Sequence, residues 1–194
     1  MLASITPLGQ RGRGASWRRT VTAYVVASVA GGALVGAVAG ALGDLVWTVE
    51  APAWALLVAA ALAVAAAGLD AAGRVTGPHR QVDEVWLTRY RDWVVGLGYG
   101  FQLGLGGVTI VTSATVYLTW LLELLTGDVL AGVAVGAVFG LARALPVLTN
   151  RRAVDPASLR AVHRRWQAAA TPIRRLATAV AATCGAALTA LAVT

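Results

Sequence analysis

Apolar segments of membrane-spanning length alternate along this chain with segments rich in arginine. All sixteen basic residues are arginine, and they fall in three clusters. The clusters are Arg11, Arg13, Arg18 and Arg19; Arg74, Arg80, Arg89 and Arg91; and Arg143, Arg151, Arg152, Arg160, Arg164, Arg165, Arg174 and Arg175. The two connections between them carry only acids: Asp44, Glu50, Glu123 and Asp128. Because basic loops stay on the cytoplasmic side during insertion, this alternation predicts both a membrane location and a topology.

The composition excludes an ordinary water-soluble domain. Hydrophobic residues make up 58% of the chain, charged residues only 13%, and the mean hydropathy is +0.70. A soluble domain carries about twice that share of charge. The net charge is +7. Because the arginine clusters flank apolar spans, they favour contact with anionic lipid headgroups over binding of nucleic acid. The single cysteine, Cys184, excludes an internal disulfide and a CxxC redox pair.

Five apolar stretches reach the length of about 20 residues that a helix needs to cross the hydrocarbon core. They are Val21 to about Val46, Ala53 to about Ala72, Trp93 to about Leu125, Val129 to Leu148, and about Ile173 to Val193. We therefore expect an all-α, multi-pass protein of the cytoplasmic membrane, with residues 1–194 in one transmembrane domain. The basic residues 1–20 and the loops 73–92 and 149–172 are expected inside, so five crossings place the N-terminus inside and the C-terminus outside.

The tryptophans agree with this topology, because Trp prefers the interface between membrane and water. Four fall at expected cytoplasmic boundaries and three at or near outer ones: Trp17, Trp86, Trp93 and Trp166, then Trp47, Trp54 and Trp120. Residues 157–175 read as a basic amphipathic helix lying on the inner leaflet before the last span.

The third stretch is too long for a straight span. A helix of this length would measure about 50 Å, against about 30 Å of hydrocarbon. Its first half is rich in glycine and its second half in hydroxyl residues, which predicts a break whose freed backbone groups are satisfied by side chains. A tilted helix whose glycines allow close packing is the alternative.

Two glycine-rich segments resemble each other. The segment GGALVGAVAGAL (31–42) matches AGVAVGAVFGLA (131–142), with glycines repeating every four residues on one helix face. These helix-packing candidates are Gly32, Gly36, Gly40, Gly132, Gly136 and Gly140. The charge pattern gives the two segments opposite directions, which is typical of an inverted repeat in membrane carriers.

Together these segments give the chain a resemblance to a known family over most of residues 11–194. The basic approach and first span are similar to the second helix of the transmembrane carriers of cytochrome c biogenesis and thiol reducing-equivalent transfer. Phe101–Gly104 resembles the start of that family's FxxGWTPCxGP stretch, and Gly140–Pro146 resembles the end of its fifth helix. The resemblance implies a six-helix, three-plus-three inverted architecture.

The chain departs from that family where the chemistry lies. The Thr-Pro-Cys positions of the motif correspond to Gly106, Gly107 and Val108, and the resemblance leaves no counterpart for the first helix with its partner cysteine. Thiol–disulfide exchange needs an attacking thiolate and a resolving thiol. The resemblance therefore favours the architecture and not the redox activity.

Polar residues around the expected break are the candidates for a solute path, because a broken helix exposes backbone groups that bind ions or polar solutes. They are Gln102, Gly104, Gly106, Gly107, Thr109, Thr112, Ser113 and Thr115. The alternative is that the hydroxyls bond back to helix carbonyls or join neighbouring helices. Arg143 could line the path, pair with Asp70, or extend to the interface.

These observations favour three functions in turn. The first is small-solute transport, or a subunit of a transport or assembly complex. The second is a non-transporting structural or assembly partner related to the thiol carriers, forming an oligomer or binding another membrane subunit. The third, a membrane thiol oxidoreductase, would rest on Cys184 alone. No cofactor is expected, and no enzyme site is expected because no nucleophile can be inferred beside the acids Asp83 and Glu84. No metal site is expected either, because His79 and His163 are the only histidines and lie in separate loops.

Overall fold

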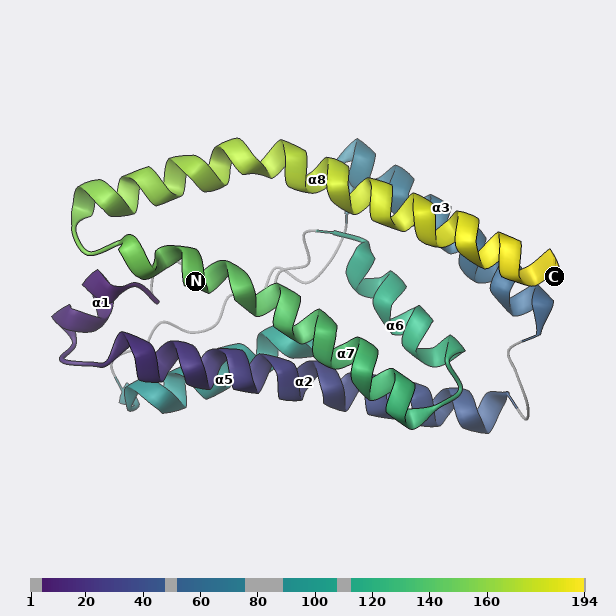
Figure 1. Cartoon of the computed structure of the whole chain (residues 1–194), viewed down its shortest axis with the longest axis horizontal. Helices are drawn as coiled ribbons and strands as arrows, with labels where there is room; N and C mark the ends of the chain where they lie inside the picture. The colour runs from purple at the N-terminus through teal and green to yellow at the C-terminus, as the bar shows by residue number, and fades with distance from the viewer. Residues whose placement is uncertain (1–4, 48–51, 76–88, 108–112, 194) are drawn as a thin grey trace. The chain divides into compact units, whose positions relative to one another are not determined.

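A computed structural model describes residues 5–47, 52–75, 89–107 and 113–193, and each regular element in these ranges is a helix (Figure 1). The elements are α1 (Pro7–Gly12), α2 (Trp17–Val46), α3 (Ala53–Ala72), α5 (Asp92–Leu105), α6 (Thr115–Leu125), α7 (Val129–Ala144), the 3-10 helix η1 (Leu145–Arg152) and α8 (Pro156–Val193). The predicted all-α fold class is confirmed.

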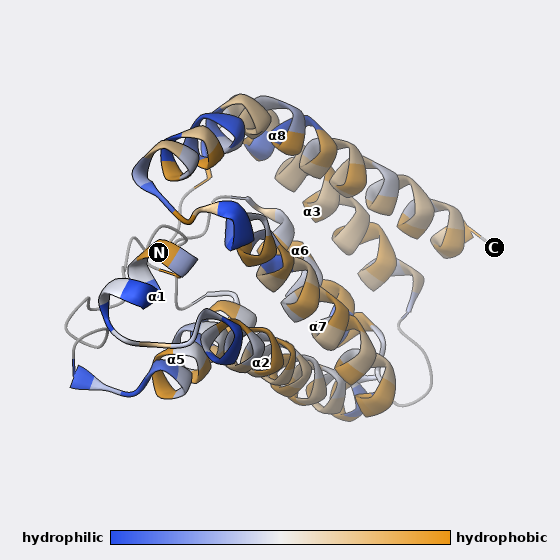
Figure 2. Cartoon of the chain, turned by 60° about the vertical axis from the view of Figure 1, so that its left-hand side comes forward, coloured by the Kyte–Doolittle hydropathy of each residue, from blue (hydrophilic) through white to orange (hydrophobic). Residues whose placement is uncertain are grey.

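Four of the described helical segments are long and apolar enough to cross a membrane: α2, α3, α7 with η1, and α8. Figure 2 shows apolar residues along these helices and hydrophilic residues on α1, on η1 and on the first turns of α8. Four of the five expected spans thus correspond to such segments. The expected third span does not, because it is divided.

The third apolar stretch forms two short helices. Helix α5 ends at Leu105, and α6 begins at Thr115. Gly106 follows α5 with a φ of 84°, a left-handed conformation that stops the helix and favours glycine. Of the two interpretations, the break is therefore correct and the continuous tilted helix is wrong. Between the two helices, residues 108–112 lie outside the described part of the chain.

Helix α3 buries its small residues and exposes its large apolar ones. Ala59 and Ala63 are fully buried, whereas Val64 is 61% exposed and Trp54 64% exposed. A helix in a water-soluble protein has the opposite arrangement, with large apolar side chains in the core. Large side chains facing outward and alanines facing neighbouring helices are what a lipid-embedded helix requires.

The chain divides into two compact units, each described here by itself. The first comprises Met1–Gly32, His79–Ile110 and Ala137–Ala169, and the second Ala33–Pro78, Val111–Gly136 and Ala170–Thr194. The first has a core of large residues, which are Ile5, Val21, Tyr24, Val95, Tyr99, Ala144 and Val147. The second has two small clusters made mainly of alanine, of which one includes Leu118 and the other Leu188. Helices α2, α7 and α8 contribute residues to both units.

In the first unit α5 lies against α2 through glycines. A Cβ atom added to Gly96 would overlap the carbonyl of Thr20, and one added to Gly100 would overlap that of Tyr24. Because both residue numbers rise together, the two helices run in parallel in this unit. The glycines that make α5 a poor helix former thus let its backbone contact α2 directly.

In the second unit the two repeated glycine segments contact each other. A Cβ atom added to Gly36 would overlap the carbonyl of Gly132, and one added to Gly132 would overlap that of Gly36. One turn along α2, Gly40 lies against the carbonyl of Asp128, at 2.5 Å from an added Cβ. The rising number on α2 and the falling number on α7 show that the helices are antiparallel in this unit, as the charge pattern predicts.

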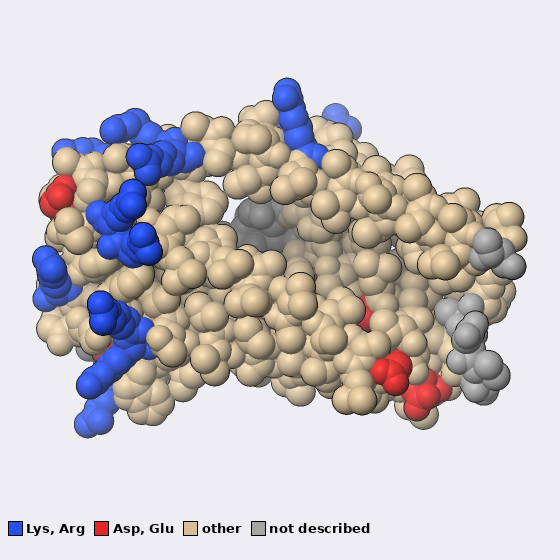
Figure 3. All heavy atoms as spheres, in the orientation of Figure 1, with Lys and Arg blue, Asp and Glu red and all other residues tan. Residues whose placement is uncertain are grey.

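Arginines of the first unit gather over a few elements. Figure 3 shows basic side chains over α1, η1 and the beginnings of α2 and α8. Within α2 itself, Arg18 and Arg19 lie in the first turn, while the exposed Asp44 lies in the last. A helix that is basic at one end and acidic at the other is oriented by the positive-inside rule.

Helix α8 is longer than the sequence predicts. It continues from Pro156 to Val193 with Pro172 in its interior, which corresponds to about 57 Å at the standard rise per residue. The expected basic surface helix and the last span are therefore one element. Proline removes one backbone hydrogen bond of a helix and often bends it, but good helix formers on both sides, the alanines at 168–170 and the Arg-Arg-Leu-Ala run at 174–177, keep the helical conformation favourable.

Candidate functional site

A buried aspartate holds the start of α6 in the second unit. Asp70, in the last turn of α3, is 2% exposed. Its Oδ2 accepts a hydrogen bond from the Ser113 hydroxyl at 2.7 Å, and its Oδ1 accepts one from the Ala114 backbone N–H at 2.8 Å. Helix N-termini have backbone N–H groups without partners in the helix. Asp70 supplies an acceptor there from a different helix.

The hydroxyls beside Asp70 extend the same network. The oxygens of Ser113 and Thr115 lie 2.7 Å apart, and the Thr115 N–H also donates to the Ser113 oxygen at 3.2 Å. Since the single proton of Ser113 points to Asp70, the Thr115 hydroxyl is the donor of the other bond. The hydrogen-bonding groups of Asp70, Ser113 and Thr115 are therefore partners of one another. This arrangement agrees with the alternative interpretation of the sequence, in which hydroxyl side chains join neighbouring helices and do not line a solute path.

The end of α5, in the first unit, is held by an arginine. Arg143 of α7 donates to the carbonyl oxygen of Gly106 at 3.1 Å, and its guanidinium lies 5.4 Å from the ring centre of Phe139. A cation at a helix C-terminus is favourable because the last carbonyls have no partner in the helix. This bond to the backbone at the end of α5 is not one of the three interpretations of Arg143 given by the sequence, and those interpretations stay predictions.

The remaining predicted path residues have separate environments. Gln102 is half-buried on α5, and Gly107 follows the end of that helix. An added Cβ on Gly104 would overlap the carbonyl of Ser28, so this glycine lies at a helix contact. Thr109 and Thr112 lie outside the described residues. The candidates on α5 belong to the first unit and Ser113 and Thr115 to the second, so a single path formed by all of them stays a prediction.

A second buried acid lies on α6. Glu123 is 0% exposed, and within the described residues neither of its carboxyl oxygens has a hydrogen-bond partner. The indole N–H of Trp120, one turn earlier on the same helix, is likewise buried without a partner in that part of the chain. Buried polar groups are normally paired, so each exception calls for an explanation.

Two further glycines lie at close helix contacts that side-chain hydrogen bonds accompany. Ser28 of α2 donates to the Gly140 carbonyl at 2.8 Å in the first unit, and an added Cβ on Gly140 would overlap the carbonyl of Ser28. In the second unit, Gly43 lies against the carbonyl of Leu124, which also accepts a bond from the Trp47 indole at 3.3 Å. Close backbone contact supported by side-chain hydrogen bonds stabilises helix pairs in membranes.

The sequence does not predict the roles of the two buried acids. The charge pattern places Glu123 in an outer acidic connection, although its position within Leu121-Leu122-Glu123-Leu124-Leu125 is a signal for burial. Asp70 was considered only as a partner for Arg143. No three His, Cys, Asp or Glu side chains come together to hold a metal ion in the described parts of the chain. Cys184 is half-buried against the alanine cluster of Ala63, Ala67 and Ala181.

Proteins of known name are similar to this chain in sequence over most of its length. The methylamine utilization protein MauF of Methylophilus methylotrophus is 34% identical over 181 residues, which covers 89% of this chain and 62% of that protein. The chain is similar to MauF. The MauF proteins of Paracoccus versutus and Paracoccus denitrificans are 34% and 33% identical, each over 76% of this chain and 57% and 56% of their own lengths. The chain thus spans about three-fifths of the length of the curated relatives it matches.

The similarity corrects the resemblance drawn from motifs. The relatives are named for methylamine utilization and not for cytochrome c biogenesis, so the likeness to the thiol carriers is a distant one at most. No family model matches the chain. No solved structure matches it either.

Proposed function

We propose that this chain is an integral membrane component of a methylamine utilization system and that it acts as an assembly partner of another protein, without carrying a solute. The observation that carries the proposal is the similarity to MauF over 89% of the chain. Its membrane-type helices agree with a membrane subunit. We further propose that it lies in the cytoplasmic membrane with its N-terminus inside.

Two features of the break favour an assembly role over transport. The polar groups of Asp70, Ser113 and Ala114 are bonded to one another, and Arg143 is bonded to the Gly106 carbonyl. A carrier site needs polar groups that are available to the solute. Groups that already satisfy one another fix helix ends instead, which suits a rigid scaffold.

Deletion of the gene in its own bacterium tests the proposal. We expect growth on methylamine to be lost and growth on succinate to be normal, while the initial uptake of radiolabelled methylammonium is unchanged. Loss of uptake together with growth would instead support transport. Normal growth on methylamine would show that the chain has no part in methylamine utilization.

Variants reintroduced into the deletion strain separate the two roles. The double change Thr109→Val and Thr112→Val should restore growth fully if no solute passes these hydroxyls. Gly36→Leu should fail, because any side chain there meets the backbone of Gly132. Gly68→Leu is the matched control, since no atom lies within 4 Å of an added Cβ at that position. Failure of the double threonine variant with normal protein levels would favour transport.

A further inference from the structure

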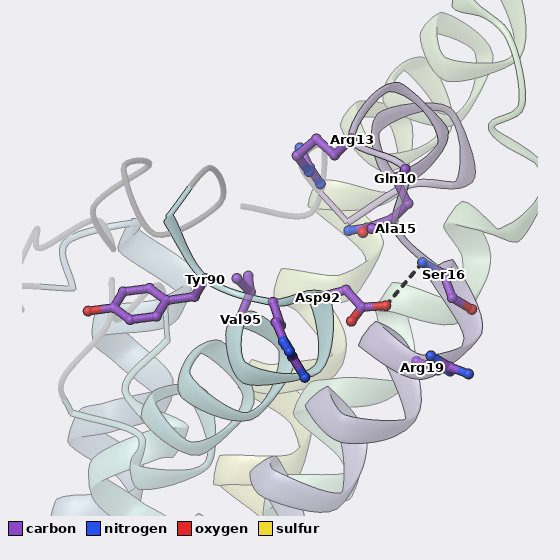
Figure 4. Close-up of a pocket in the computed structure, with 10 residues that line it drawn as sticks. Gln10, Arg13, Ala15, Ser16, Arg19, Tyr90, Asp92 and Val95 are labelled. Atoms are coloured by element: carbon purple, nitrogen blue, oxygen red, sulfur yellow. Dashed lines mark hydrogen bonds between the residues drawn. The ribbon is translucent and has the colours of Figure 1, made fainter.

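A polar cavity lies in the first unit, at the beginnings of α2 and α5. Its volume is about 540 Å³. One side is formed by Gln10 and by the connection from Arg13 to Ser16, and the other by the segment from Tyr90 to Val95, as Figure 4 shows. Nothing in the proposed function uses this cavity.

The lining of the cavity is strongly basic. Three arginines from three separate segments, Arg13, Arg19 and Arg91, are among the residues that line it. Among the described residues, Asp92 is the one carboxylate in the lining. These described residues carry three positive charges and one negative charge, a net charge of +2 (3 − 1), which a phosphate group balances well. Arginine is suited to phosphate because its planar fork of donors matches two phosphate oxygens at once.

The negative group is already engaged by the backbone. Asp92 accepts a hydrogen bond from the Ser16 N–H at 3.1 Å on Oδ2 and one from the Trp93 N–H at 2.9 Å on Oδ1. The first of these joins the two walls of the cavity, as the dashed line in Figure 4 marks. Asp92 therefore fixes the shape of the cavity, and the basic side chains determine which ligand it attracts.

The wall that carries Arg13 is built as a fixed structure. Gln10 is 2% exposed, its side-chain oxygen accepts from the Thr20 hydroxyl at 3.3 Å, and its backbone carbonyl accepts from the Ala15 N–H at 2.9 Å. Helix α1 is also joined to the chain beyond η1, because the Leu8 N–H donates to the Ala153 carbonyl at 3.1 Å. A fixed wall lowers the entropy that a ligand must remove on binding.

We propose that this cavity binds the phosphate group of an anion. The ligand is either the headgroup of an anionic phospholipid or a free phosphate or phosphate ester, which present the same chemistry to the arginines. A lipid is consistent with the position, because the apolar parts of α2 and α5 begin beside the cavity at Val21 and Val95. Anionic lipids concentrate at the cytoplasmic leaflet, where basic segments meet them.

Binding to the purified full chain in neutral detergent tests the proposal. The cavity variant is Arg13→Gln with Arg91→Gln, and the control is Arg151→Gln with Arg165→Gln, which removes the same charge from the same unit outside the cavity. The probes are phosphatidylglycerol, phosphatidylcholine and inorganic phosphate, with lipid retention followed by native mass spectrometry. We expect the cavity variant to bind its anion at least about tenfold more weakly than the control.

The probes distinguish the two sources of phosphate. Preferential retention of phosphatidylglycerol, lost in the cavity variant, identifies a lipid site. Binding of inorganic phosphate with the same dependence on the arginines, and displacement of lipid by phosphate but not by chloride, identifies a free phosphate site. Equal binding of both anionic probes by the cavity and control variants overturns the proposal.

A second measurement uses the unaltered protein, in case the cavity variant does not fold. Phenylglyoxal modifies accessible arginines, and peptide mass spectrometry locates the products. Phosphate or phosphatidylglycerol vesicles should slow the modification of Arg13 and Arg91 at least about tenfold relative to chloride, as expected for charged hydrogen bonds to these side chains, and leave Arg151 unaffected. Equal rates at Arg13 and Arg151 under all three conditions would refute the site.

Discussion

At the scale of single residues, the two buried acids differ in whether they have hydrogen-bond partners among the described residues. Asp70 accepts bonds from Ser113 and Ala114, so Asp70→Ala leaves the buried Ala114 N–H without its acceptor and removes the carboxylate partner of the half-buried Ser113 hydroxyl. We expect the free energy of unfolding in detergent to fall by about 2 kcal/mol, from the lost cap and the unsatisfied groups. Thermal unfolding followed by tryptophan fluorescence measures this change. Asp44→Ala, at an exposed position, should change stability little, and equal effects of the two substitutions would contradict the role of Asp70.

Glu123 should respond in the opposite direction. Its carboxyl oxygens have no partner among the described residues, and a buried charge without a partner lowers stability. Glu123→Gln keeps the shape and removes the charge, so we expect the free energy of unfolding to rise by about 1 kcal/mol. The same fluorescence measurement applies. A fall in stability would show that the carboxylate has a partner that the described residues do not include.

Residue-level pairing was the part that the sequence could not provide. Ser113 and Asp70 are separated by 43 positions, and no local pattern indicates that they meet. The hydroxyl content around residue 113 did indicate that freed backbone groups would need partners. It could not show that the main partner would be a carboxylate from another helix, because that depends on how α3 and α6 pack in the second unit.

At the scale of elements, the contact of α2 and α7 in the second unit depends on glycine. We expect Gly36→Ala to lower the free energy of unfolding by about 1–3 kcal/mol, because the added methyl group forces the backbone of Gly132 away. Gly68→Ala, in the open, should be neutral or stabilising by up to about 1 kcal/mol, since alanine favours helix over glycine. Thermal unfolding of both variants measures these changes. An equal loss of stability in both would exclude the contact of Gly36 with Gly132 as the cause.

The start of α8 should depend on pH. Asp155 Oδ1 accepts from the N–H groups of Ala157 and Ser158 at 2.9 and 2.8 Å, and the bond from the Ser158 backbone is the main cause that holds the pKa of Asp155 below its ordinary value. A lowered pKa in the folded state gives stability that is present above the unfolded value of about 3.9. That stability is lost as the pH falls through the folded pKa.

Hydrogen exchange at residues 157–160, corrected for the intrinsic rate, should therefore increase below about pH 4. Asp155→Asn keeps a good capping residue and removes the titration. Exchange in this variant should follow the intrinsic rate alone. The same acid-dependent increase in both proteins would place its origin elsewhere in the chain.

Element boundaries followed the sequence where hydrophobicity alone sets them. The second span was expected from Ala53 to about Ala72 and is α3 with the same limits. The third span also ends at Leu125 as expected, but hydrophobicity does not set the limits of the break inside it, because a glycine with positive φ and a buried aspartate on another helix define that break. The sequence does not predict the continuity of α8 through Pro172, because proline indicates a boundary, although good helix formers before and after it sustain the helix.

At the scale of the whole molecule, the arginine pattern predicts an odd number of crossings, and α5 and α6 decide whether this is right. An odd number requires the stretch from 93 to 125 to cross the membrane once, although each helix in it is shorter than a full span. If both short helices returned to the side they entered from, the number of crossings would be even. The C-terminus would then lie inside.

Alkaline phosphatase fusions separate these topologies, because this enzyme needs disulfides that form only outside the cytoplasm. We expect activity for fusions after Asp128 and after Thr194, and none for fusions after Arg74 or Arg152. Activity after Asp128 shows that the divided stretch crosses, since Arg74 and Asp128 then lie on opposite sides. Inactive fusions at Asp128 would mean that α5 and α6 form a re-entrant pair, and the positive-inside prediction for the C-terminal half would be wrong.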